Sequence, residues 1–122
     1  MKTKLNKKQV EVMKRVNALY PCFDSCDSFY NKALVYDDEE VVMLYSYFTT
    51  VCVLDKKNKK YCLNPGVDID LLLSNTTLRH IKEFLKQYMD SSCDYHKKDF
   101  EKVVYGLSHK DKNYDPSLIY LF

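Results

Sequence analysis

Glycine and proline are scarce in this chain: its 122 residues include two glycines and three prolines. Phosphate-binding loops of nucleotide-binding folds need closely spaced glycines, because the backbone must approach the phosphates. Gly66 and Gly106 are far apart in the sequence, so a loop of this kind is excluded. A Gly- or Pro-rich linker is excluded as well, and the length suits one core. We therefore expect a single domain over residues 1–122.

Long apolar segments are also missing. No run approaches the ~18 residues that a membrane-spanning helix needs, and the lysine-rich start, Met1–Lys8, lacks the apolar stretch of a signal peptide. The five cysteines are an odd number without an export signal, which favours reduced thiols over a disulfide framework. We expect a protein of the host-cell cytoplasm.

The composition that is present is that of a folded protein with many tyrosines. Hydrophobic residues make up 46% and charged residues 30% of the chain, and there are eleven tyrosines but no tryptophan. Tyrosine suits half-buried surfaces and contact surfaces. The net charge of +2 conceals a basic segment at 2–15 and an acidic one at 24–40. This alternation lacks a continuous basic stripe, so nucleic-acid binding is a less favoured alternative.

Apolar periodicity predicts an α+β fold. Between Asn6 and Tyr20 apolar residues recur at helical spacing, which predicts an amphipathic helix that ends at Pro21. Segments rich in valine, tyrosine and threonine predict antiparallel strands joined by short turns at 33–36, 41–47, 49–54 and 61–63. Two helices follow, one to about Met89 and one from Asp94 to about 106–108. We expect an N-terminal helix, a three- to four-stranded antiparallel β-meander, and two C-terminal helices packed on one face.

The start of the first of these C-terminal helices is a candidate anion-binding site. Free backbone N–H groups at a helix N-terminus attract negative charge, and hydroxyl, guanidinium and imidazole groups add donors. The alternative is that the threonines cap the helix, that the arginine pairs with the acidic turn 37–40, and that the histidine is a core-edge residue. The candidate ligand-binding residues are Thr76, Thr77, Arg79 and His80.

Other patterns of reactive residues are weaker. Cys22 and Cys26, with Cys93 and His96, would make a ligand set that zinc accepts, but their spacing is loose and favours separate thiols, so we expect no metal and no cofactor. No serine or cysteine lies in a glycine-flanked turn with a histidine partner. We therefore expect no catalytic residues and no enzyme.

Three segments resemble a known family: Phe29–Ala33, Ser46–Val51, and the pattern Ser74-x-Thr76-Thr77-x-Arg79-His80-Ile81-x-x-Phe84-Leu85. They are similar to a family of small uncharacterised proteins carried by phages and plasmids of Gram-positive bacteria. The similarity covers about residues 28–88, and Phe48 and Cys52 replace the asparagine and alanine that are frequent in that family. The resemblance implies a setting rather than a reaction: accessory proteins of mobile elements commonly bind host machinery.

The leading hypothesis is a non-enzymatic protein that binds a host or phage macromolecule, with Tyr45, Tyr47 and Phe48 as contact residues. Inhibition of a host defence system, such as a CRISPR effector, is the form of binding that the resemblance suggests. The alternatives are a binder of small phosphate-bearing ligands at Thr76–His80 and a nucleic-acid-binding protein. The apolar C-terminal segment 118–122 either docks on its own core or sheet edge, or binds a partner.

Overall fold

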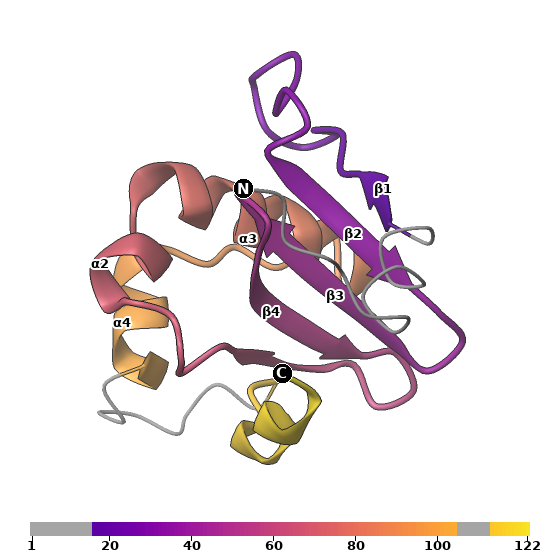
Figure 1. Ribbon diagram of the computed structural model, residues 1–122, viewed down its shortest axis with the longest axis vertical. Helices are drawn as coiled ribbons and strands as arrows, with labels where there is room; N and C mark the ends of the chain where they lie inside the picture. The colour runs from indigo at the N-terminus through magenta and orange to yellow at the C-terminus, as the bar shows by residue number, and fades with distance from the viewer. Residues whose placement is uncertain (1–15, 105–112) are drawn as a thin grey trace, which may run out of the picture.

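The structure is a computed structural model that describes residues 16–104 and 113–122 (Figure 1). Five strands come first: β1 (Val16–Ala18), β2 (Ala33–Asp37), β3 (Val41–Ser46), β4 (Thr49–Asp55) and β5 (Lys60–Leu63). The helices follow: α2 (Ile69–Leu72), α3 (Asn75–Tyr88), α4 (Lys97–Val104) and the 3₁₀ helix η1 (Pro116–Leu121).

The strands form one antiparallel sheet in the order β1-β2-β3-β4-β5. Short connections impose this order from β2 to β5, because a link of a few residues can join only neighbouring antiparallel strands. A longer loop, residues 19–32, joins β1 to β2. Between β2 and β3 the Asp38 carboxylate accepts hydrogen bonds from the N–H groups of Glu40 and Val41, both at 2.8 Å. After β4 the Asp55 carboxylate holds the next turn in the same way. In both turns, therefore, an aspartate side chain accepts hydrogen bonds from the turn backbone. The strand pattern alone would leave such a side chain in solvent without a structural role.

The chain is α+β, but the predicted architecture is wrong in its strand count and in its first element. Residues 16–18, expected at the end of an N-terminal helix, form β1, in which Val16 pairs with Tyr36 and Ala18 with Leu34. Pairing with the edge of β2 satisfies that backbone and outweighs the weak helical preference of the segment. The remainder of the predicted helix, residues 6–15, lies outside the described residues. The four predicted strands correspond to β2–β5.

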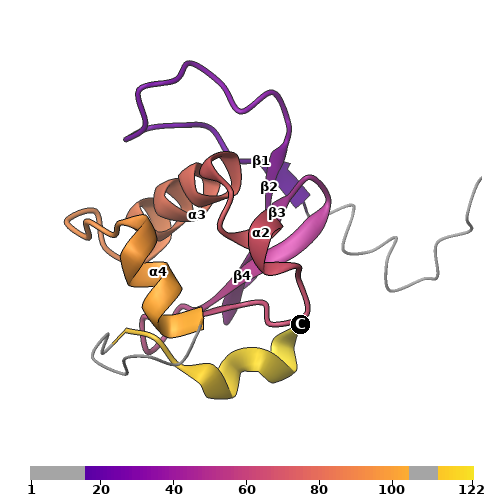
Figure 2. The ribbon, with the colours of Figure 1, turned by 90° about the vertical axis from the view of Figure 1, so that its left-hand side faces the viewer.

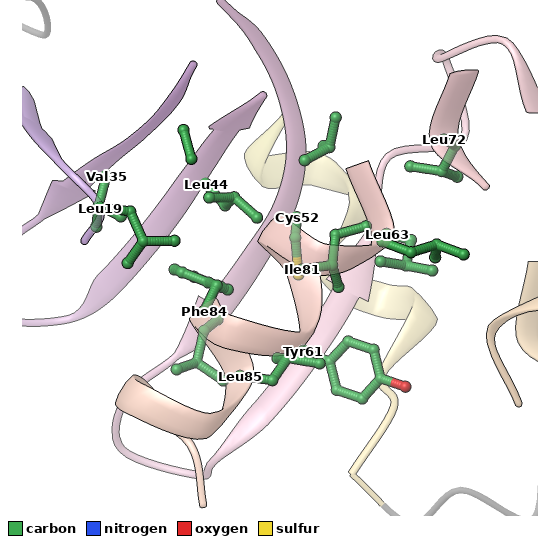
Figure 3. Close-up of a cluster of buried hydrophobic side chains, with 14 of the residues drawn as sticks. Leu19, Val35, Leu44, Cys52, Tyr61, Leu63, Leu72, Ile81, Phe84 and Leu85 are labelled. Carbon is green, nitrogen blue, oxygen red and sulfur yellow. The ribbon is translucent and has the colours of Figure 1, made fainter. Parts of the chain in front are cut away.

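The main core lies between the sheet and α3, with α4 on the same side (Figure 2). Ser74 caps α3: its hydroxyl accepts a hydrogen bond from the N–H of Thr77. Ile81, Phe84 and Leu85 of α3 are fully buried and point at the strands (Figure 3). They meet residues of every strand from β2 to β5, among them Val35, Leu44, Leu54, Tyr61 and Leu63. The spacing of three and four residues gives α3 one apolar face that covers the sheet.

A second, smaller core lies on the other face of the sheet and is formed by η1, which was not one of the two predicted helices. Leu118 of η1 packs against Val53 and Cys62 there. Tyr61 anchors the preceding segment: its N–H donates to the carbonyl of Asn113 at 2.8 Å, and its carbonyl accepts from the N–H of Asp115 at 2.9 Å. The apolar C-terminal segment thus docks on its own sheet. No helix within 16–104 or 113–122 is long and apolar enough to cross a membrane.

The docking of η1 predicts a specific loss of stability. Leu118→Ala leaves a cavity against Val53 and Cys62 and is expected to lower the free energy of unfolding by about 2–4 kcal/mol. Tyr120→Ala on the exposed side of η1 is the matched control, with a change within about 0.5 kcal/mol. Urea denaturation measures both, and equal midpoints for the two variants would contradict this packing.

Candidate functional site

Two tight turns meet at one end of the sheet. Tyr30 and Asn31, before β2, have φ angles of 53° and 62°, and Tyr47 and Phe48, between β3 and β4, have φ angles of 51° and 66°. All four residues are therefore in the left-handed region. The N–H of Tyr47 donates to the carbonyl of Lys32 at 2.8 Å, which joins the two turns.

The aromatic residues in these turns adopt a costly backbone conformation and remain exposed. A left-handed non-glycine residue costs roughly 1–2 kcal/mol, and two-residue hairpins of this kind favour Asn-Gly. Nevertheless Tyr30 is 78% exposed, Phe48 73% and Tyr47 42%. Burial of the rings does not repay this cost. Strain of this sort concentrates at functional sites, so we name Tyr30, Tyr47 and Phe48 the aromatic turn surface and treat it as the candidate site.

A pocket of about 280 Å³ lies between the two turns and the first half of α3. We call it the turn pocket; its lining includes Tyr30, Lys32, Tyr47, Thr76, Arg79 and His80. The Lys32 ammonium lies 5.6 Å from the centre of the Tyr47 ring, within the range of a cation–π contact. The ring of Phe29 meets His80 edge to face at 4.7 Å. Aromatic walls and two cationic side chains therefore surround one space.

His80 is a buried part of this pocket. Its Nδ1 lies 2.9 Å from the Ser46 hydroxyl of β3, which in turn lies 3.4 Å from the Thr77 hydroxyl. Burial lowers the pKa of His80 to about 4, and the neighbouring Arg79 charge acts in the same direction. The imidazole is therefore neutral at pH 7. This network joins α3 to the strand that leads into the Tyr47–Phe48 turn.

Arg79 is held by an aspartate of the loop between β1 and β2. Its Nε donates to Asp24 Oδ2 at 3.0 Å and its Nη2 donates to Asp24 Oδ1 at 2.5 Å. The hydrogen bond from Arg79 is the largest cause that holds the pKa of Asp24 well below its usual range. The expectation that Arg79 pairs with the turn 37–40 is wrong, because Asp37 binds Lys56 and Asp38 holds its own turn.

Glu83 of α3 binds the loop between β1 and β2, a role that the sequence pattern does not indicate. Its side chain is buried. Its Oε1 accepts hydrogen bonds from the N–H groups of Phe23 at 2.9 Å and Asp24 at 2.7 Å. Gln87, one turn later, donates to Glu83 Oε2 and to the carbonyl of Tyr20, both at 2.7 Å. A buried carboxylate with three donors is satisfied, so these bonds position the loop and, through Asp24, the side chain of Arg79.

The predicted anion-binding residues do not all meet at one site. Thr76 is exposed and, with Arg79 and His80, lines the turn pocket. Thr77 is buried, and its N–H is used by the Ser74 cap. The alternative expectation, that the threonines cap the helix, is wrong, because the cap is Ser74. Thr76 stays available to a ligand.

The predicted contact residues do not share one surface. Tyr47 and Phe48 form the turn itself, whereas Tyr45 lies on the opposite face from the buried residues Leu44 and Ser46, because side chains alternate along a strand. Tyr30 was missed as a contact residue. The adjoining Asn31, which tolerates a left-handed conformation, is the signal that could have indicated a turn there.

The cysteines give no support for a metal site. In the described parts of the chain no group of three or more His, Cys, Asp or Glu side chains is arranged to hold a metal ion, and this includes Cys22, Cys26, Cys93 and His96. Cys52 and Cys62 are both buried, the first in the core under α3 and the second in the core under η1. They therefore fill two different cores, as small apolar residues do.

A model of one protein family matches residues 18–102, well over half of the chain. The chain belongs to this family, described as "Family of unknown function (DUF8033)". The DUF8033 match includes the loop between β1 and β2, both turns and all of α3, and thus every residue of the turn pocket. No curated protein and no solved structure matches the chain.

Removing the Glu83 carboxylate is expected to destabilise the protein. Glu83→Ala leaves two part-buried N–H groups of the loop without an acceptor, so the free energy of unfolding should fall by about 2–4 kcal/mol. Lys82→Ala, on the same helix, is the control and should change it by less than about 0.5 kcal/mol. Urea unfolding measures both, and a loss of stability no larger in Glu83→Ala than in the control would disprove this role.

The lowered pKa of His80 predicts a pH-dependent stability. Between its usual value of 6.5 and about 4, the unfolded chain binds a proton that the folded protein does not, so stability falls as the pH is lowered. From pH 7.5 to pH 5 the loss from this group is about 2 kcal/mol. His80→Asn does not titrate, so its unfolding free energy should fall by that much less over the same range. Parallel curves for the two proteins would refute the assignment.

Proposed function

We propose that this chain is a non-enzymatic binding protein that recognises a partner protein through the aromatic turn surface. The observation that carries the proposal is that Tyr30, Tyr47 and Phe48 are exposed on turns whose left-handed backbone costs free energy. Exposed aromatic anchors around a pocket are the groups that contribute most binding energy at protein interfaces. A rigid two-residue turn also presents its rings at little conformational entropy cost.

A protein partner accounts for the charges better than a nucleic acid does. Phosphate-backbone binding requires several unpaired cations along a stripe. At this surface Arg79 is already bound to Asp24, which leaves Lys32 as the cation of the pocket lining without a carboxylate partner among the described residues. The pocket, at about 280 Å³, also lies below the roughly 300–1,000 Å³ typical of sites for drug-sized ligands. These features favour the side chains of a protein over a nucleotide.

The setting that we propose follows the sequence resemblance: an accessory protein of a mobile element whose partner is a host or phage protein in the cytoplasm. A rigid surface that covers a functional face of such a partner would make this chain an inhibitor. Binding is the step that the residues support directly, and it is the step to test.

Phe48→Asn separates binding from folding. Asparagine tolerates the left-handed region, so the variant should be more stable by about 1 kcal/mol, while the loss of an exposed anchor should weaken partner binding at least about tenfold. Tagged wild-type and variant proteins are compared by affinity capture from cells of the natural host, with unfolding measured in parallel.

Tyr120→Ala is the matched control, because Tyr120 is equally exposed, at 76%, but lies on η1. It should retain the partner that Phe48→Asn loses. Undiminished capture by Phe48→Asn, or loss of the partner by Tyr120→Ala alone, would place the contact surface elsewhere.

A further inference from the structure

The turn pocket is lined by a buried histidine whose second ring nitrogen has no hydrogen-bond partner among the described residues. His80 is 1% exposed, and its one hydrogen bond within the described residues is made by Nδ1 to Ser46. No buried side-chain nitrogen or oxygen among the described residues is both sealed and unbonded. The Nε2 atom of His80 therefore keeps some contact with solvent, and His80 lines the turn pocket. A nearly buried nitrogen at a pocket floor is a group that a ligand can satisfy.

The other polar groups of the pocket are donors as well. The N–H group of Thr76, in the first turn of α3, has no acceptor within the described residues. Lys32 is exposed at the rim and has no carboxylate partner in that part of the chain. Arg79 also lines the pocket, with its charge paired to the Asp24 carboxylate. A ligand that accepts hydrogen bonds and carries one negative charge matches this set.

We infer that the turn pocket receives the carboxylate of an aspartate or glutamate side chain of the partner protein. This inference rests on the proposed function and names the chemistry of the group that the aromatic turn surface flanks. The carboxylate pairs with Lys32 and accepts a hydrogen bond from His80 Nε2–H. It selects the tautomer in which the Ser46 hydroxyl donates to Nδ1. Tyr30 and Tyr47 enclose the aliphatic part of the same side chain.

A monoanion fits better than a phosphate group. A phosphate near neutral pH carries close to two charges and is usually held by more than one free cation. Here the Arg79 charge is shared with Asp24, whose carboxylate lies next to the pocket and opposes a second negative charge. The carboxylate of an acidic side chain needs one counter-charge, which Lys32 supplies.

The experiment titrates isotope-labelled full-length protein with N-acetyl-glutamate methylamide and follows the amide signals of Lys32, Tyr47 and Thr76 together with the His80 ring nitrogens. We expect saturable shifts with a millimolar dissociation constant, a clear change at Nε2, and at least about fivefold weaker binding in Lys32→Glu. The neutral N-acetyl-glutamine methylamide should give no saturable shift. Inorganic phosphate, the second probe, should bind more weakly than the glutamate compound.

Three results would overturn the inference: no saturable shift with the glutamate compound, equal shifts with the glutamine compound, or tighter binding of phosphate. His80→Asn retains a polar atom near the position of Nδ1 but has none at the position of Nε2. It should weaken glutamate binding without changing the shifts of the Phe48 amide in the free protein. Unchanged affinity in that variant would exclude His80 as a ligand contact.

Partner capture distinguishes failure of this inference from failure of the proposed function. We expect Lys32→Glu to lose the partner and Lys82→Glu, a charge reversal on α3 outside the turn pocket, to keep it. If Phe48→Asn loses the partner but Lys32→Glu retains it, the aromatic turn surface stands and the carboxylate inference falls. If Phe48→Asn retains the partner, the proposed function itself is contradicted, whatever the result for Lys32→Glu.

Discussion

The link between β3 and β4 leaves the backbone almost no choice of turn conformation. Ser46 pairs with Thr49, so two residues must reverse the direction of the strand, and both adopt left-handed angles. Ser46 also lies opposite Ala33 of β2. Ser46 then points toward α3 and meets His80, while Tyr47 reaches the turn pocket. The geometry of the candidate site follows from this one constraint.

Helix α3 connects that constraint to the rest of the molecule. Its apolar residues seal the core, and its polar residues on the adjoining side bind the loop between β1 and β2, a long excursion seen at the top of Figure 1. Glu83 accepts hydrogen bonds from the loop backbone, and Gln87 donates to the backbone at the start of the loop. Arg79 binds the side chain of Asp24 in the same loop. Because buried polar groups are costly unless each is bonded, the loop has one favoured position. The donors of the turn pocket are thereby placed before any ligand arrives.

Local sequence patterns predicted the elements whose structure depends on local properties. The strands β2–β5 alternate or are rich in β-branched residues, and α3 has a clear cap and apolar face, so their positions followed from periodicity. β1 did not, because Val16–Ala18 is short and is defined by its partner strand rather than by its own pattern. Likewise η1 and residues 113–115 depend on Tyr61, which is distant in the sequence.

In the candidate site, too, the features set by local sequence were predictable and those set by distant residues were not. Thr76, Arg79 and His80 stood out in the sequence because they begin one helix, and three of the four predicted residues do line one pocket. Their chemistry could not be read there, since the Arg79–Asp24 pair and the His80–Ser46 bond join residues 55 and 34 positions apart. Tyr30 was missed because exposure and backbone angle, rather than residue type, make it a contact candidate. Function here depends on how distant segments meet.

The central claim is that the aromatic turn surface contacts the partner. Amide hydrogen exchange of the captured complex, compared with the free protein, measures this directly. The account predicts slower exchange at residues 29–32 and 46–49 and little change in α4 and η1. Protection confined to η1 or α4, with the two turns exchanging as fast as in the free protein, would contradict it.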